Sequence, residues 1–257
     1  MTRDSPLDDD EFLYEHYHKN LAPLVSEPAL APATEPSDHS PDRPGKSYRR
    51  AERLPLAEPK RSAFLAGLRR RRSYTDPTER RPITDAELST LLRYAYGELR
   101  DDDGVDPRRP VPSGGACYPL ELYPIVLESP DVEPGIYHYD VRDDALERLQ
   151  RGDYSEWVRD NWTWIRPADT VSAVVVITAL PERSAERYGE MGYLFAGIET
   201  GAVVQNLQLV AAELGLGSRP HNGLNYRAIR DRLRLRDDEF LLSTVAVAGT
   251  SEPERDR

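Results

Sequence analysis

The stretch from Tyr193 to Leu214 restricts the fold more than any other, because it is apolar on almost every side when it is wound as a helix. A helix of this kind is buried all round, either inside a large core or along a subunit interface. Gln205 and Asn206 are polar exceptions near its middle, and buried polar groups require hydrogen-bonding partners. The two amides suit a helix–helix contact as well as a ligand, so the stretch predicts a long core helix and leaves their role open.

Strand patterns lie before and after this helix. Val171 to Leu180 is a nearly continuous run of β-branched residues, which is typical of a strand covered on both faces, and Phe240 to Val247 is a second candidate. Leu120 to Glu128 also predicts a strand, while Gly135–Asp140 and Ala145–Leu149 predict a hairpin. Because helical and strand patterns alternate along the chain, the sequence predicts an α/β or α+β domain.

Two further helices precede the first strand. Ser62 to Arg72 places its apolar side chains on one side. Thr84 and Glu87 form a capping box that opens the second helix, and Gly97 is placed to close it as a C′ glycine.

Residues 1–59 differ from the rest because their prolines are spaced too closely for a long helix or a central strand. A short helical patch around Tyr14 and Tyr17 precedes most of these prolines. We predict an extended or disordered N-terminal arm, either a solvated tail or a segment that docks on a partner subunit. The folded domain then covers residues 60–250, and residues 251–257 form a C-terminal tail.

Composition excludes several classes of function. The net charge of −11 argues against nucleic-acid binding, which needs a basic face. With Cys117 as the single cysteine, an internal disulfide framework or a cysteine–histidine zinc cluster is not expected, so no metal is predicted. No run approaches the roughly 18 apolar residues of a membrane span, and the acidic start is unlike a signal peptide. We therefore expect a cytoplasmic protein.

Two short segments carry groups suited to a phosphorylated cofactor. Arg69 to Arg72 followed by Ser73 offers guanidinium forks and a hydroxyl, as a phosphate and a ribityl chain require, although basic residues also favour a helix C-terminus for electrostatic reasons alone. Pro112 to Ala116 is a glycine-rich turn whose small residues let the backbone approach a flat ring closely. Such a turn is also common in ordinary loops, so neither segment is specific alone.

Taken in order, these segments resemble the FMN-dependent nitroreductase superfamily, and within it the SagB-type (ThcOx-like) dehydrogenases that act on peptide natural products. The resemblance covers about residues 60–250, with a looser echo in His16 to Lys19. It is carried by Arg71-Arg72-Ser73, by Pro112 to Ala116 running into Tyr118 to Tyr123, by Gly135 to Tyr139, and by the helix with Gln205-Asn206 that leads into Leu214 to Gly217.

The resemblance implies a three-layer α+β fold in which helices flank a central, mostly antiparallel sheet, and it implies an FMN-binding homodimer. The cofactor would be held by residues of four segments. By this resemblance they are Arg71, Arg72 and Ser73 at the phosphate and ribityl end, Pro112, Ser113, Gly114 and Gly115 from the neighbouring subunit, Gln205 of the long helix, and Asn222 and Gly223 in a loop that faces the flavin ring. A C-terminal arginine, Arg255 or Arg257, would also reach the phosphate.

The residues expected to take part in catalysis depart from the family pattern. Azoline dehydrogenases of this family carry a lysine–tyrosine pair before the long helix, and here the corresponding residues are Arg187 and Tyr188. Because arginine is not a general base at neutral pH, Tyr188 has the larger role or the reaction differs. Glu199 is either a buried acid near the substrate or a salt-bridged core residue.

The resemblance therefore implies an FMN-dependent oxidoreductase that oxidises a heterocycle or amino-acid unit of a modified peptide. An NAD(P)H-dependent reductase of nitro compounds or quinones is the alternative enzyme. A third hypothesis is a non-catalytic flavin-binding subunit that docks on a peptide-modifying partner protein.

Overall fold

Six strands form one sheet at the centre of the molecule, in the order β3-β2-β1-β4-β6-β5, and every neighbouring pair is antiparallel. The computed structural model describes residues 13–26, 46, 48, 50–74, 80–99, 108–162 and 170–249. The predicted tail at residues 251–257, with Arg255 and Arg257, lies outside the described residues, as does most of the predicted N-terminal arm.

The helices and strands follow one another in this order: α1 (Leu13–Ser26), α2 (Ala63–Arg70), α3 (Asp85–Tyr96), the 3₁₀ turn η2 (Gly114–Ala116), β1 (Leu120–Val126), β2 (Gly135–Asp140), β3 (Ala145–Arg151), α4 (Ser155–Asn161), β4 (Ala173–Ala179), α5 (Glu182–Tyr188), α6 (Met191–Glu213), β5 (Leu216–Pro220), α7 (Tyr226–Leu233) and β6 (Phe240–Gly249).

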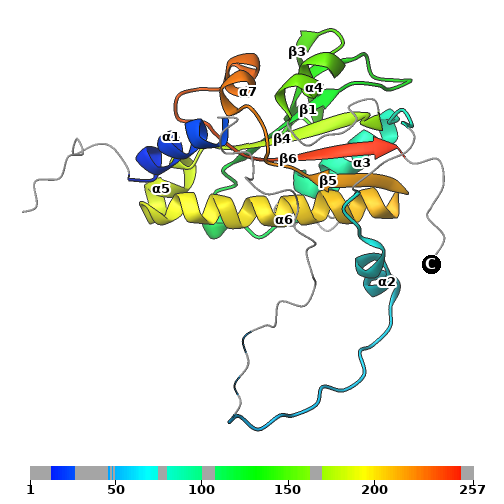
Figure 1. The fold of residues 1–257 in the computed structure, drawn as a ribbon, viewed down its shortest axis with the longest axis vertical. Helices are drawn as coiled ribbons and strands as arrows, with labels where there is room; N and C mark the ends of the chain where they lie inside the picture. The colour runs from blue at the N-terminus through cyan, green and yellow to red at the C-terminus, as the bar shows by residue number, and fades with distance from the viewer. Residues whose placement is uncertain are drawn as a thin grey trace, which may run out of the picture.

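Helices cover the sheet on both faces, which confirms the predicted three-layer α+β architecture (Figure 1). On one face, buried side chains of α3 and α6 such as Leu91 and Leu207 pack against alternate residues of β1, β4 and β6. On the other face, Trp162, Ile229 and Leu233 pack against the intervening residues. The β4 strand is buried at every position because it lies in the middle of this arrangement, as its β-branched run predicts.

Helix α3 begins and ends where the sequence predicts, although its end is built differently. The Thr84–Glu87 capping box is present at its N-terminus. Gly97 closes the helix, but with φ −67° it does not adopt the left-handed conformation expected of a C′ glycine. A Cβ added at Gly97 would lie 2.7 Å from both the Arg93 Cα and the Tyr139 hydroxyl, so close packing requires the glycine here.

Helix α6 is the long apolar helix that the sequence predicts. It runs beneath the sheet (Figure 1), and within one chain it is only partly buried. Met191, Leu194 and Ile198 are 47%, 52% and 62% exposed, whereas Val203 and Leu207 are fully buried. Its apolar character all round is therefore not explained by the core of a single chain.

Two parts of the N-terminal region differ in their contacts. The helical patch predicted around Tyr14 and Tyr17 is present as α1, and Tyr14 stacks on Tyr193 with ring centroids 5.5 Å apart. Residues 51–62 are exposed and run as an extended stretch apart from the sheet before reaching α2, in which no residue is buried (Figure 1).

Candidate active site

The glycine-rich turn and the residues before the long helix lie together. A Cβ added at Gly115 would lie 2.7 Å from the Tyr188 hydroxyl and 2.9 Å from a guanidinium nitrogen of Arg187. One added at Gly114 would lie 3.2 Å from the Phe195 ring. Two of the predicted catalytic residues thus contact the predicted flavin loop within one chain, and the small size of the glycines permits that contact.

Glu199 joins the same group from α6, where its carboxyl group is buried. The Tyr96 hydroxyl donates a 2.8 Å hydrogen bond to Glu199 Oε1. Burial is the main cause that raises the pKa of Glu199, while the polar side chains of Ser113 and Tyr96 and the charge of Arg109 act in the opposite direction. Within the described part of the chain, Glu199 has no salt-bridge partner. The alternative role allowed by the sequence, a salt-bridged core residue, would require one.

Arg109 stacks on aromatic rings beside this carboxyl group. Its guanidinium carbon lies 4.4 Å from the centre of the Tyr96 ring and 4.6 Å from that of Tyr118. Both distances are within the range of cation–π attraction. This arrangement places a positive charge close enough to act on the Glu199 carboxyl group.

The arginine-rich segment lies at a different place, against the C-terminal half of α6. Ser73 Oγ accepts a 3.0 Å hydrogen bond from the Gln208 side chain, and Tyr74 N–H donates to the Ser218 carbonyl at 3.1 Å. A Cβ added at Gly217 would lie 2.9 Å from the Tyr74 ring. Helix α6 and strand β5 therefore hold Ser73 in place.

Two arginines next to Ser73 are available for an anion. Arg70 pairs with Glu213, but within the described residues neither Arg71 nor Arg72 has a carboxylate partner. Arg71 Nη1 lies 3.4 Å from Ser73 Oγ. Two guanidinium groups and a hydroxyl form a donor set suited to a phosphate group.

The loop before α7 is held by β6. Asn222 Oδ1 accepts hydrogen bonds from the Ser243 hydroxyl at 3.0 Å and from Thr244 N–H at 3.3 Å. His221 is buried beside it, and its Nε2 lies 3.0 Å from the Gly223 carbonyl. Burial lowers the pKa of His221. The Asn222–Gly223 loop is thus hydrogen-bonded to β6.

Helix α6 separates the two predicted halves of the cofactor site. Glu199, beside the glycine-rich turn, and Gln208, beside Ser73, are nine positions apart on the helix. At 1.5 Å per residue this spacing corresponds to about 14 Å along the axis. The single chain therefore does not bring Ser73 and Ser113 together around one small group.

Two glutamines of α6 differ in their surroundings. Gln205, the predicted site residue, is exposed in the single chain, whereas Gln208 is buried and donates a hydrogen bond to Ser73. Tyr96, which donates to Glu199, was also missed as a site residue. The helical period contained the signal for Gln208, because Val203, Leu207 and Ala211 define the buried face on which Gln208 lies.

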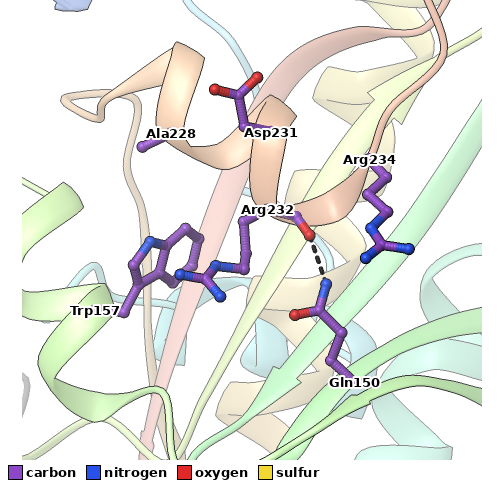
Figure 2. Close-up of a pocket in the computed structure, with 6 residues that line it drawn as sticks. All are labelled: Gln150, Trp157, Ala228, Asp231, Arg232 and Arg234. Carbon is purple, nitrogen blue, oxygen red and sulfur yellow. Dashed lines mark hydrogen bonds between the residues drawn. The ribbon is translucent and has the colours of Figure 1, made fainter.

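A cavity of about 370 Å³ lies between α4, α7 and β3, on the sheet face opposite α6 (Figure 2). Residues that line the cavity contact one another. Gln150 donates a 2.6 Å hydrogen bond to the Arg232 carbonyl, and the Arg232 guanidinium lies 5.4 Å from the Trp157 ring centre. None of the predicted site residues lines it.

In the described part of the chain, no group of three or more histidine, cysteine or acidic residues is arranged to hold a metal ion. None of the helices described combines the length and apolar character that a membrane span requires.

Comparison with family models matches residues 68–250 to the model of the nitroreductase family. "Putative nitroreductase MJ1384" of Methanocaldococcus jannaschii is 32% identical over 169 residues, which are 64% of this chain and 81% of that protein. The microcin B17-processing protein McbC of Escherichia coli is 31% identical over 141 residues, covering 51% of this chain and 50% of McbC. The alignment therefore spans only half the length of McbC.

Solved structures show the same fold. A chain of the E. coli microcin synthetase McbBCD complex with truncated pro-MccB17 bound has a TM-score of 0.71 at 21% identity, covering 93% of both chains. A "putative nitroreductase in complex with FMN" from Desulfovibrio desulfuricans has a TM-score of 0.53 at 15% identity, covering 77% of this chain and 92% of that one.

Proposed function

Because the chain belongs to the nitroreductase family, we propose that it is an FMN-dependent oxidoreductase of the SagB type that oxidises a heterocycle or amino-acid unit of a modified peptide. One observation carries this proposal furthest. Tyr188 and Arg187 lie directly against the glycine-rich turn expected to line the flavin. The similarity to McbC, which is named for processing a peptide, supports the peptide substrate.

The described residues fit FMN at its phosphate end. Arg71, Arg72 and the Ser73 hydroxyl offer donors to a phosphate without competition from a carboxylate in the described residues. Asn222 and Gly223 would face the ring from the ordered loop before α7. The FMN named in the D. desulfuricans structure, which shares the fold, supports this choice of cofactor.

The site would be completed in a homodimer. Residues 191, 194, 198, 201 and 205 recur at intervals of three and four along α6 and are all exposed in the single chain. This spacing forms one helical stripe, and Gly201 within it allows close approach of a second backbone. A second copy packed on this stripe would bring its Pro112–Gly115 turn toward the Arg71–Ser73 segment of the first and would cover Gln205.

Within this site the chain's own groups have distinct roles. When bound, FMN supplies a ring that exchanges a hydride with the substrate. Tyr188 is the residue of the Arg187–Tyr188 pair that holds or passes a proton, because arginine stays protonated at neutral pH. Arg187 supplies a fixed positive charge beside it, suited to a substrate carbonyl or carboxylate. Glu199 contributes a buried acid behind the turn.

A partner protein is part of this proposal. The McbBCD structure, whose fold matches over most of this chain, is a complex of several proteins with a bound peptide. A peptide substrate of this chain would accordingly be delivered by a peptide-binding partner.

The first experiment is a visible absorption spectrum of the purified protein, with the cofactor released by heat and identified. Yellow protein that releases FMN supports the proposal. Arg71→Ala is expected to weaken FMN binding about tenfold or more through loss of a charge-assisted contact, and Ser113→Tyr to block binding by filling the turn. Arg227→Ala, at an exposed arginine of α7, is the matched control and should bind FMN normally. Colourless protein that takes up no FMN contradicts the proposal.

The alternative enzyme is an NAD(P)H-dependent nitro or quinone reductase, and Arg187 in place of the family's lysine is the observation that favours it. An assay with NADPH and menadione separates the two. Rapid turnover, with no oxidation of an azoline-containing peptide, would support the reductase.

A further inference from the structure

The cavity between α4, α7 and β3 has a polar lining to which the proposed function assigns no role. Its volume is about 370 Å³, and it is lined by Gln150, Trp157, Ala228, Asp231, Arg232 and Arg234 (Figure 2). Both arginines are exposed, so the cavity is open to solvent. Its volume falls among those of ligand pockets, roughly 300–1,000 Å³, and is much larger than a single bound ion needs.

Gln150 is fixed in this lining from two sides. Its Oε1 accepts a 2.9 Å hydrogen bond from the Tyr154 hydroxyl, and its Nε2 donates to the Arg232 carbonyl at 2.6 Å. The amide nitrogen carries a second N–H, for which the described residues supply no acceptor. The Gln150 side chain therefore presents a donor to the cavity, while its own acceptor oxygen is already engaged.

The two arginines of the cavity are not neutralised by the described residues. Among these residues neither Arg232 nor Arg234 forms an ion pair, whereas Arg230 on the same helix pairs with Asp237. Asp231 also lines the cavity, but its carboxylate points away from both guanidinium groups (Figure 2). The described part of the chain therefore leaves two positive charges at this cavity without a counter-charge.

Both arginines are held at the cavity. The guanidinium carbon of Arg232 lies 5.4 Å from the centre of the Trp157 ring and 5.6 Å from that of Tyr154, within the range of cation–π attraction. Arg234 ends α7 as its C-cap with φ 54°, in the left-handed conformation that favours glycine. Strain of this kind in a residue other than glycine is found where the side chain has a function.

The lining restricts the chemistry of a ligand. Two guanidinium groups and one amide N–H donate hydrogen bonds, so a ligand must bring acceptors and negative charge. Carboxylates meet both needs, because they accept two parallel hydrogen bonds from a guanidinium fork. Since the whole chain carries a net charge of −11, an acidic ligand is attracted here by the local charge and not by the protein as a whole.

The position of the cavity favours an acidic peptide over a small acid. Strand β3, which contributes Gln150, is at the edge of the sheet, and β2 is its only strand partner among the described residues. The backbone of an edge strand can hydrogen-bond to an extended peptide. A peptide that runs along β3 would thus place acidic side chains at the neighbouring cavity.

We propose that this cavity binds an acidic segment of a peptide, with carboxylates of the segment paired to Arg232 and Arg234 and its backbone beside β3. The inference deepens the proposed function and rests on it only for the source of the peptide, which is the modified-peptide substrate. Because the cavity and α6 lie on opposite faces of the sheet, the segment bound here is a different part of that peptide from the unit that is oxidised.

Isothermal titration calorimetry of the purified full chain tests this proposal. The ligand is a short peptide of alternating serine and glutamate, blocked at both ends, and the same peptide with glutamine in place of glutamate is the neutral control. Succinate and inorganic phosphate separate a peptide site from a site for small anions. The variants are Arg232→Gln and Arg234→Gln. Arg227→Gln is the matched control, at an exposed arginine of α7 that does not line the cavity.

We expect the glutamate peptide to bind, more weakly as the salt concentration rises, and the glutamine peptide not to bind. Arg232→Gln and Arg234→Gln should each raise the dissociation constant about tenfold, because each removes charge-assisted hydrogen bonds. Arg227→Gln should bind like the wild type, and circular dichroism should show that the variants are folded. If Arg232→Gln does not fold, Arg234→Gln decides the question, because Arg234 is exposed.

Several results would contradict the docking site. They are no binding of the glutamate peptide, equal binding of the glutamine peptide, and equal dissociation constants for the wild type, Arg232→Gln and Arg234→Gln. Succinate or phosphate that binds as tightly as the peptide would show a site for small anions and make the peptide assignment wrong. The absorption spectrum of the same protein separates this test from the proposed function. Yellow protein that does not bind the peptide refutes only the docking site, and colourless protein that binds it through the two arginines refutes only the flavin.

Discussion

At the scale of single residues, Gly97 shows that a glycine at a helix end is sometimes required by packing rather than by a left-handed turn. Gly97→Ala would place a methyl group 2.7 Å from the Arg93 Cα and 2.7 Å from the Tyr139 hydroxyl. Backbone must move to relieve the first contact, so we expect a loss of about 1–3 kcal/mol in the free energy of unfolding. Urea denaturation followed by circular dichroism measures this change.

Gly67→Ala is the matched control for that measurement. Its added Cβ would meet only side-chain atoms, at 3.9 Å or more, in a helix where alanine is favoured over glycine. Stability equal to or above that of the wild type is expected. Gly97→Ala with unchanged stability would show that the end of α3 adjusts easily.

His138 links the stability of the hairpin to pH. Its ring nitrogens lie 2.9 Å from Glu121 and 2.8 Å from Glu147, so it connects β2 to both neighbouring strands, and Arg183 shares Glu121. The hydrogen bond to Glu121 is the main cause that raises the pKa of His138 above its usual 6.5, with Glu147 adding to it. A raised pKa means that the folded state binds the proton more tightly than the unfolded state.

The contribution of His138 is therefore full below about pH 6.5 and is lost as the pH rises through the higher pKa of the folded state. Thermal unfolding temperatures measured from pH 5.5 to 8.5 should fall more steeply for the wild type than for His138→Gln. Parallel curves for the two proteins would mean that His138 does not bind its proton preferentially in the folded state.

At the scale of elements, α1 shows how part of the N-terminal region attaches to the domain. Glu190 accepts hydrogen bonds from the first backbone N–H groups of α1, from Leu13 at 2.6 Å and Tyr14 at 3.1 Å. On the same helix His18 is buried, stacks on Phe240 with centroids 4.6 Å apart, and has its pKa lowered to about 4 by burial. The attachment therefore uses a cap and a few aromatic contacts.

Removing the cap should release this helix. In Glu190→Ala, trypsin should cleave after Lys19 about fivefold faster than in the wild type, because a lost helix cap favours the open state by roughly 1 kcal/mol. Mass spectrometry of the products gives the rate at that bond. Glu186→Ala changes an exposed acid of the neighbouring helix α5 and should leave the rate unchanged. Equal rates in all three proteins would show that Glu190 does not hold α1.

Sequence patterns predicted those helices and strands whose own residues carry a clear local pattern. The β-branched run gave β4, and the capping box gave α3. Other elements lacked such a signal, and three of them show why. Helix α7 buries only Ile229 and Leu233 among arginines, α4 is seven residues long, and β5 reads Leu-Gly-Ser-Arg-Pro and is a strand because it pairs along β6.

The candidate site likewise contains parts that the sequence predicts and parts that it does not. The glycine-rich turn and the arginine segment were visible in the sequence because their composition is unusual. The contact between Tyr96 and Glu199 was not, since it joins residues 103 positions apart. Only the packing of α3 on α6 creates it, and no local pattern encodes that packing.

At the scale of the whole molecule, the exposed stripe on α6 links the assembly of two chains to the cofactor site. An apolar helix that leaves Leu194 and Ile198 more than half exposed in the single chain has apolar surface that a second copy would remove from water. The same second copy would join the two halves of the predicted flavin site, which one chain keeps about 14 Å apart along α6. Assembly and FMN binding should therefore fail together.

Ile198→Glu tests this coupling because it buries a charge in the proposed interface and leaves the core unchanged. We expect a folded monomer by light scattering, and an FMN dissociation constant raised at least tenfold relative to the wild type. Leu149→Glu is the matched control, since Leu149 is an exposed apolar residue on β3 at the far edge of the sheet. If Ile198→Glu still forms a dimer, the interface lies elsewhere on the molecule. If Ile198→Glu is a monomer that binds FMN like the wild type, one chain is sufficient for the flavin site. The proposed sharing of the site between two subunits would then be wrong.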